Sequence, residues 1–263
     1  MLFTILGPLG IGGTDETGSP TRRALLTALL LRSQETVGTA ELAELLWDEP
    51  PASATANIRS HLTGVRRSLD AAVPGLSSRL RTYRGGRGGY SLCVGAGELD
   101  LHVFARAARH GRTLLLRGEP DGAVTVLEEA LDLWRAPFGR DLPRTRWFSA
   151  HVAGVNDARF DAYQNLFAAR VLADRTELLA YRIERAVAEA PYRQRLWELL
   201  AAVHCVRGDA PSALSAIGRC RRLFAEDLGL GLPPRVEAMQ RAALDWDGAE
   251  ARRLVAAQEP SLS

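Results

Sequence analysis

The hydrophobic pattern of the chain changes once, near Leu99, and this change constrains the fold more than any other feature. Before it, extended stretches with glycine-rich turns alternate with segments of helical spacing; after it, every apolar pattern has helical spacing. Hydrophobic residues make up 46% of the 263 residues and charged residues 24%, which is typical of globular proteins. We therefore expect a mainly α-helical protein with a small β component: a mixed domain over 1–97, an all-helical domain over 98–247 and a flexible tail over 248–263.

The first domain is expected to combine strands and helices. Its predicted elements, in chain order, are a β-prone stretch over 2–11, a polar turn over 12–18, three helices capped by Ser19, Thr39 and Ser53, and a β-hairpin over 80–94. Ser19 followed by Pro20 is a typical helix start, because serine accepts a hydrogen bond from the first turn and proline needs no backbone donor there. Glycines cluster between the two halves of the hairpin and predict its turn.

The second domain contains a degenerate internal repeat. Its helical segments are expected over 100–118, 120–135, 147–172, 176–190, 192–207, 211–225 and 234–246. Arg117-Gly118-Glu119 and Arg207-Gly208-Asp209 each end one helix and lead into another that begins with small residues. Helical hairpins of this kind stack in tetratricopeptide-like domains, although the offset of 90 residues differs from their usual period of about 34.

The third helix separates an apolar face from a polar one. On a helical wheel its core-facing residues fall within about 60° of one another, and they are Ile58, Leu62, Val65 and Leu69. The opposite face carries Ser53, Ala56, Asn57, Ser60, Thr63, Gly64 and Arg67, with Arg59 and Arg66 on one flank. Short side chains let a helix enter the major groove, where asparagine and arginine bond to base edges. The pattern predicts a DNA recognition helix; a basic surface helix without a partner is the alternative.

Positive charge is concentrated around this helix and the hairpin. Between residues 59 and 87 seven arginines face a single acid, Asp70, although the net charge of the chain is only +2. Such a cluster is typical of a nucleic-acid-binding surface. Arg84, Arg87 and Gly88 lie at the expected tip of the hairpin, where we expect contact with the phosphate backbone or the minor groove. A dinucleotide-binding glycine loop is excluded because no helix follows these glycines.

Catalytic and metal sites are not expected. All 33 basic residues are arginine, which excludes a Walker A loop, a protein-kinase ATP site and Schiff-base chemistry. The histidines lack metal-ligand spacing and no GxSxG motif occurs, so we expect no catalytic residue, metal or cofactor. Three widely spaced cysteines fit reduced thiols, and the sequence predicts neither a signal peptide nor a membrane span. The corresponding expectation is a cytoplasmic, nucleoid-associated protein.

Several stretches together resemble the Streptomyces antibiotic regulatory protein family. In the first half these are residues 22–31 (RRALLTALLL), 41–47 (ELAELLW), Pro50-Pro51, 65–69 (VRRSL) and 87–92 (RGGYSL). In the second half they are Phe104, 131–135 (LDLWR), 141–143 (DLP), Leu196-Trp197, Arg207-Gly208-Asp209 and 228–230 (LGL). The resemblance extends over about residues 2–247. It implies an OmpR-type winged helix-turn-helix followed by a tetratricopeptide-like bacterial transcriptional activation domain, as in the small, pathway-specific members of the family.

The resemblance also implies a function and partners. Members of the family activate secondary-metabolite gene clusters from direct repeats near the promoter −35 element, so the implied partners are double-stranded DNA, RNA polymerase holoenzyme and a second protomer on DNA. The expected contacts of this chain are Asn57, Ser60, Thr63 and Arg67 in the major groove, Ser53, Arg59, Arg66, Arg84, Arg87 and Gly88 on the backbone or through the wing, and Trp47, Asp48 and Glu49 on polymerase. The alternative is an interaction or ligand-sensing protein whose N-terminal domain only docks; it predicts weak DNA binding without sequence preference.

Overall fold

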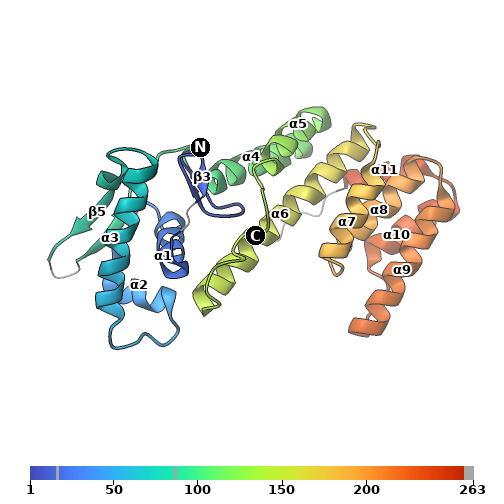
Figure 1. Ribbon diagram of the computed structural model, residues 1–263. Coiled ribbons are helices and arrows are strands. Elements are labelled where there is room, and N and C mark those ends of the chain that lie inside the picture. Colours follow the sequence, from blue (N-terminus) through green and yellow to red (C-terminus); the bar gives the residue numbers. More distant parts are fainter. Residues whose placement is uncertain (16–17, 86–87, 258–263) are drawn as a thin grey trace. The chain divides into compact units, whose positions relative to one another are not determined.

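The computed structural model describes residues 1–15, 18–85 and 88–257, and it divides into two compact units (Figure 1). Unit 1 comprises Met1–Arg106 and Asp132–Ala158, and unit 2 comprises Ala107–Leu131 and Arg159–Ser263. Helices predominate and the strands are short. The predicted fold class is confirmed: a winged helix-turn-helix with a small β component comes first in the chain, and a helical domain follows.

Unit 1 begins with a small antiparallel sheet. Its strands pair in chain order and are β1 (Phe3–Thr4), β2 (Gly10–Ile11) and β3 (Thr14–Asp15). Gly12 and Gly13 form the tight turn between β2 and β3 with φ angles of +58° and +89°, a region that favours glycine. The sequence predicted extended chain before this turn; β3 is an additional strand after it.

Three helices follow, α1 (Pro20–Leu31), α2 (Thr39–Leu46) and α3 (Ala54–Ala72). The predicted start of α1 is confirmed, because the Ser19 hydroxyl accepts a hydrogen bond from the Arg22 N–H and Pro20 is the first helical residue. The predicted cap of α2 is wrong. Thr39 is itself the first helical residue, because pairing with a later strand holds the preceding Gly38 in an extended conformation.

A second antiparallel sheet contains the predicted hairpin. A short 3-10 helix, η1 (Leu76–Arg79), leads into β5 (Leu80–Tyr83) and β6 (Gly89–Leu92), and β6 also pairs with β4 (Val37–Gly38). The β-hairpin expected over 80–94 is therefore confirmed, with β6 as the central strand of its sheet. In Figure 1 the hairpin lies beside α3.

The core of unit 1 confirms the predicted inner face of α3. The four side chains expected to face the core are each at most 1% exposed: Ile58, Leu62, Val65 and Leu69. They belong to one apolar cluster with residues of α1, α2 and both sheets. Phe138 and Phe148, which come from much later in the chain, are buried in the same cluster. The face of α3 that remains exposed is fixed by this packing.

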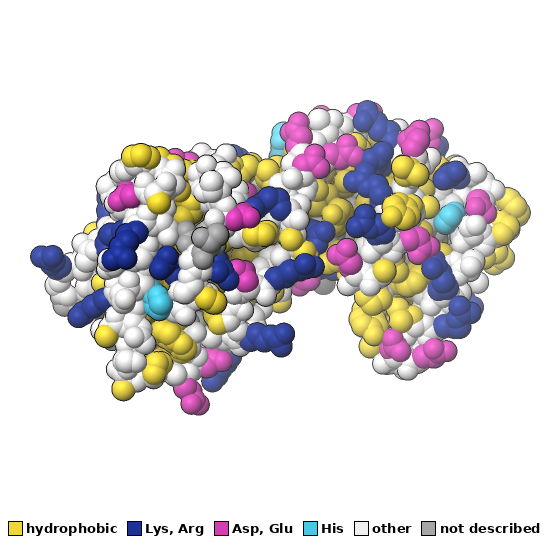
Figure 2. Space-filling model, viewed as in Figure 1, with side chains coloured by type: hydrophobic (Ala, Val, Ile, Leu, Met, Phe, Trp, Pro, Cys, Tyr) yellow, Lys and Arg dark blue, Asp and Glu magenta, His cyan; other side chains and the backbone are white. Residues whose placement is uncertain are grey.

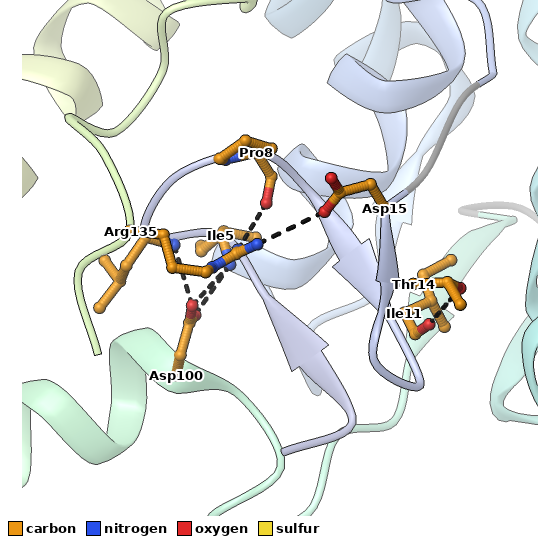
Figure 3. Close-up of polar contacts among 8 residues, drawn as sticks. Ile5, Pro8, Ile11, Thr14, Asp15, Asp100 and Arg135 are labelled. Carbon is orange, nitrogen blue, oxygen red and sulfur yellow. Dashed lines mark hydrogen bonds and ion pairs between the residues drawn. The ribbon is translucent and has the colours of Figure 1, made fainter. Parts of the chain in front are cut away.

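A buried carboxylate ties the first sheet to the helix that begins at Asp100 (Figure 3). Asp100 is 1% exposed and accepts hydrogen bonds of 2.8–2.9 Å from the backbone N–H groups of Ile5 and Leu6. Arg135 closes the same corner, because its backbone N–H donates to the Leu6 carbonyl at 2.8 Å and its guanidinium donates to the Pro8 carbonyl at 2.5 Å. Burial raises the pKa of Asp100, and the hydrogen bonds from the backbone oppose that shift. The carboxylate thus satisfies two buried N–H groups.

Unit 1 does not end at the boundary expected near residue 97. Residues 98–106 and 132–158 belong to the same compact unit, and they supply Asp100, Phe138 and Phe148 to its interior. Two helices, α4 (Asp100–Leu116) and α6 (Arg146–Leu172), therefore contribute residues to both units. The winged helix shares its core with the start of the second sequence domain.

In unit 2 the predicted helical repeat is present. Its other helices are α5 (Pro120–Leu131), α7 (Leu179–Glu189), α8 (Gln194–Val206), α9 (Ala210–Leu228), α10 (Pro234–Leu244) and α11 (Gly248–Ala256). Gly118 and Gly208 follow α4 and α8 in the same left-handed conformation, with φ angles of +74° and +72°. Ala123 and Ala213 lie in the next helices and are fully buried. The two hairpins therefore share the local geometry that their sequence similarity predicted.

The flexible tail expected over 248–263 is wrong for its first nine residues, which form α11. The Asp247 carboxylate accepts a hydrogen bond of 2.8 Å from the Glu250 N–H and caps the helix. Ala251 and Val255 are fully buried, and α11 packs against α8. An apolar pair one helical turn apart after a capping aspartate is the signal that the sequence analysis overlooked. Residues 258–263 lie outside the described residues.

Candidate nucleic-acid interface

Helix α3 has an exposed strip opposite its buried face. Ser60, Thr63 and Arg67 are exposed, Asn57 is half-buried and Arg59 is exposed on the flank. No acidic residue occurs anywhere along this part of the helix, from residue 53 to residue 69. The strip therefore combines short polar side chains with positive charge, as base readout in the major groove requires.

Two arginines of α3 are available for an external partner. The side chains of Arg59 and Arg67 make no hydrogen bond or ion pair with the residues that the structure describes. Their guanidinium groups are therefore able to turn toward DNA without breaking an internal contact. Arginine offers a planar fork of donors that fits both a guanine edge and a phosphate.

Two of the expected base-reading side chains are hydrogen bonded within the helix. The Asn57 amide donates to the Ser53 hydroxyl at 3.2 Å, and the Thr63 hydroxyl donates to the Arg59 carbonyl at 3.1 Å. The Ser53 hydroxyl therefore accepts a hydrogen bond from Asn57. The predicted cap is wrong, because this hydroxyl accepts none from a backbone N–H of α3. Since an asparagine amide has two donors and a carbonyl acceptor, Asn57 keeps bonding capacity while its orientation is fixed.

Arg66 has an internal role that the sequence did not indicate. It is half-buried, and one of its terminal nitrogens donates to the Leu80 carbonyl at 3.1 Å and to the Thr82 hydroxyl at 2.8 Å. These two acceptors belong to β5, so Arg66 holds the hairpin against α3. Contact between Arg66 and a phosphate stays a prediction.

Gly64 does not lie on the exposed face as expected. It is buried, and a Cβ atom at this position would lie 2.6 Å from Nε of Arg22, which extends from α1. Glycine is therefore explained by the close approach of the Arg22 side chain rather than by entry into a DNA groove. Gly64 is removed from the set of candidate contacts.

The hairpin adds exposed positive charge next to α3. Arg81 and Arg84 are exposed and unpaired within the described part of the chain, whereas Leu80 at the start of β5 is buried. Over the area where Figure 1 places α3 and β5, Figure 2 shows several basic side chains. The Gly88 N–H donates to the Gly85 carbonyl at 2.9 Å and closes the turn. Arg87, the other predicted tip residue, lies outside the described residues.

Arg81 was not among the predicted contacts, although the sequence contained a usable signal. Leu80 is 3% exposed and faces the core. Because successive side chains of a strand point to opposite faces, Arg81 is directed outward. Strand alternation applied to β5 would have added it to the candidates.

His61 adds no charge to this surface at neutral pH. Burial lowers the pKa of the half-buried His61, and the positive charge of Arg22 lowers it further. A lowered pKa leaves the imidazole neutral near pH 7.

The loop after α2 is attached to the start of α6. The Thr145 hydroxyl donates to the Leu45 carbonyl at 2.9 Å, and the Arg146 N–H donates to the Asp48 carboxylate at 3.0 Å. Trp47 is half-buried against the core of unit 1, while Glu49 is exposed. Of the three expected polymerase contacts, Trp47 and Asp48 therefore have structural roles within the chain.

Among the residues that the structure describes, no group of three His, Cys, Asp or Glu side chains is placed to hold a metal ion. In the same part of the chain, no helix is both long and apolar enough to cross a membrane. Cys205 and Cys220 are buried, and burial raises the pKa of each thiol to about 11. Both are therefore protonated thiols at neutral pH, in agreement with the reduced thiols expected from the sequence.

Comparison with known proteins decides the family. The family model described as "Transcriptional regulatory protein, C terminal" matches residues 13–92, and the model "Bacterial transcriptional activator domain" matches residues 99–244. Regulatory protein DnrI of Streptomyces peucetius is 29% identical over 94% of this chain and 93% of its own length. The chain belongs to the Streptomyces antibiotic regulatory protein family. As a member of this family it is a DNA-binding transcriptional regulator.

Proteins of mycobacteria are also similar to this chain over most of its length. Transcriptional regulatory protein MoaR1 of Mycobacterium tuberculosis is 29% identical over 92% of this chain and 78% of its own length. The solved structure of Mycobacterium tuberculosis EmbR, in complex with a low-affinity phosphopeptide, matches with a TM-score of 0.85 and 27% identity. That match covers 97% of this chain and 68% of EmbR. All three relatives are named as regulatory proteins.

Proposed function

We propose that this regulator binds direct repeats near a promoter −35 element and recruits RNA polymerase holoenzyme to a secondary-metabolite gene cluster. Helix α3 reads the major groove, and the β5–β6 hairpin contacts the adjacent backbone. One observation carries the proposal: four exposed arginines of α3 and the hairpin have no internal ion-pair partner among the described residues, and they are Arg59, Arg67, Arg81 and Arg84. Unpaired cations beside a strip of short polar side chains fit base recognition combined with phosphate binding.

Footprinting on the promoters next to the gene for this protein tests the proposal. We expect protection of two repeats on one face of the DNA, with log K falling by about 0.9 per phosphate contact for each unit of log salt. Weak protection without sequence preference would instead favour an interaction or ligand-sensing protein whose winged helix only docks.

Replacement of Arg67 by alanine is expected to weaken specific binding by about 1–3 kcal/mol and to relax the preference at one or two base pairs. The reason is the position of Arg67 on the exposed strip of α3 without an internal partner. Gel-shift titrations with the operator and with single-base variants of it measure both effects.

Arg222→Ala is the matched control for this experiment. Arg222 is an exposed arginine of α9 in unit 2 and has no partner within the described residues. Arg222→Ala lowers the net charge by the same amount as Arg67→Ala, and it is expected to leave the affinity for the operator unchanged. If Arg67→Ala lowers the affinity for the operator and for random DNA equally, Arg67 contacts the phosphate backbone instead of a base.

Neutralising the hairpin arginines is expected to weaken binding to all sequences alike. The double variant Arg84→Ala/Arg87→Ala removes two backbone contacts, so the slope of log K against log salt should become shallower by up to about 2. Titrations at four or more salt concentrations measure this slope, and an unchanged slope would exclude the hairpin tip from the DNA interface.

The proposed assembly is a homodimer on DNA, with one protomer on each repeat, in a nucleoid-associated cytoplasmic regulator. Direct repeats offer the same surface twice, and linkage of two binding events raises the overall affinity. Mass photometry should show two protomers on a DNA that carries both repeats. It should show one protomer on a DNA that carries a single repeat. Of the residues expected on polymerase, Glu49 is the remaining candidate, because Trp47 and Asp48 are engaged within the chain.

A further inference from the structure

A concave pocket lies among four helices of unit 2. Its volume is about 460 Å³, and residues of α4, α6, α8 and α10 line it. This is the size range of small-ligand sites in proteins. The lining is largely polar and includes the arginines Arg112, Arg195 and Arg235.

The floor of the pocket is a rigid charged network. Glu198 is 1% exposed and accepts hydrogen bonds of 2.8 and 2.9 Å from Arg235, and it also accepts one from Arg195. The same two arginines donate to the carbonyls of Val255 and Leu254 in α11, at 2.8 and 2.7 Å. One carboxylate thus holds two guanidinium groups in place, and the network keeps a net positive charge.

The rest of the lining contains one further acidic residue and one further arginine. The acidic residue, Asp161, forms an ion pair of 2.6 Å with Arg193. The arginine, Arg112, belongs to α4 and is exposed. Helices α8 and α10 both begin at the pocket, with Gln194 and Pro234, and neither has a side-chain cap. The positive ends of two helix dipoles therefore add to the arginine charge.

Neutral amides complete the lining. Gln164, Asn165 and Gln194 all line the pocket, and none of their side-chain amides has a hydrogen bond to the residues that the structure describes. A primary amide offers donors and an acceptor to the same ligand. Arginines beside amides suit a carboxylate next to further polar groups.

We propose that this pocket binds a carboxylate ligand, held by Arg112 and the arginines of the floor and oriented by Gln164, Asn165 and Gln194. The site goes beyond the DNA-binding function, because all of its residues belong to unit 2. The carboxylate comes either from an acidic peptide segment of a partner or from a free organic acid. Both sources present the same group to the same side chains.

Calorimetric titration of the full chain without DNA tests the proposal. The probes are an acetylated five-residue peptide with two glutamates, its glutamine counterpart, citrate and inorganic phosphate. We expect the glutamate peptide or citrate to bind with a Kd below about 1 mM and at least about tenfold more tightly than the glutamine peptide and phosphate. Tighter binding of the peptide identifies a partner segment as the source, and tighter binding of citrate identifies a free acid.

Two variants locate the binding. Arg112→Gln and the double variant Gln164→Ala/Asn165→Ala should each weaken binding of the preferred carboxylate about tenfold, while Arg222→Gln should leave it unchanged. The floor residues are left intact because they form the internal network. Absence of binding by both carboxylates, equal binding of phosphate, or full binding by both pocket variants would each overturn the proposal. Since no DNA is present, these outcomes are independent of operator recognition.

Discussion

Replacement of Asp100 by alanine is expected to lower the free energy of unfolding of unit 1 by about 3–5 kcal/mol. The variant leaves the backbone N–H groups of Ile5 and Leu6 without the carboxylate that accepts from them in the interior. Hydrogen exchange in increasing urea, followed by mass spectrometry on peptides of each unit, measures the loss in unit 1 separately from unit 2.

Two further variants define the cause of this effect. Asp132→Ala removes an exposed carboxylate of unit 1 and should change the free energy of unfolding by less than about 0.5 kcal/mol. Asp100→Asn keeps the shape and one acceptor oxygen, so its cost should lie between those of the two alanine variants. If Asp100→Ala lowers the free energy of unfolding by less than about 1 kcal/mol, water accepts the hydrogen bonds from the Ile5 and Leu6 N–H groups in place of the carboxylate.

A fragment of residues 1–97 is expected to be at least about 5 kcal/mol less stable than unit 1 in the full chain, and therefore largely unfolded. It lacks Leu99, Phe138 and Phe148, which are at most 3% exposed in the shared core, and it also lacks Asp100. A fragment of residues 1–158 contains all of these groups and should fold. Circular dichroism and gel shifts with the operator compare the two fragments.

The opposite result would support the boundary predicted from the sequence. If the 1–97 fragment melts cooperatively and binds a single repeat as well as the 1–158 fragment, residues 98–158 are dispensable for the winged helix. If only the 1–158 fragment does so, the DNA-binding unit includes the first helices of the second sequence domain. Transcription from an operator saturated with the 1–158 fragment then shows whether the rest of unit 2 is needed for activation.

The elements of unit 1 could be predicted because their signals are local. Ser19 and Pro20 mark the start of α1 within two residues, and the spacing of Ile58, Leu62 and Val65 alone defines the buried face of α3. The exposure of Arg67 follows from the same helical period. The exposed side of α3 was therefore largely determined by periodicity.

Contacts between distant segments could not be predicted from such patterns. Nothing near Asp100 in the sequence shows that its carboxylate accepts from Ile5, and nothing near Gly64 shows that Arg22 crosses it. The attachment of Arg66 to β5 likewise depends on tertiary packing. A helical wheel assigns a residue to a face, but it does not identify the neighbour on that face.

The bond between Asp48 and the first N–H of α6 affects how activation-defective alleles of this regulator are interpreted. A genetic screen that scores promoter output would recover substitutions of Asp48, because loss of this cap loosens the loop and the helix together. Such alleles would resemble polymerase-contact mutants while acting through protein stability. Glu49, the exposed residue next to it, has no internal partner in the described structure. Under the polymerase contact proposed for Glu49, its alleles would report on that contact directly, whereas alleles of Asp48 are interpretable only when protein abundance is measured beside promoter output.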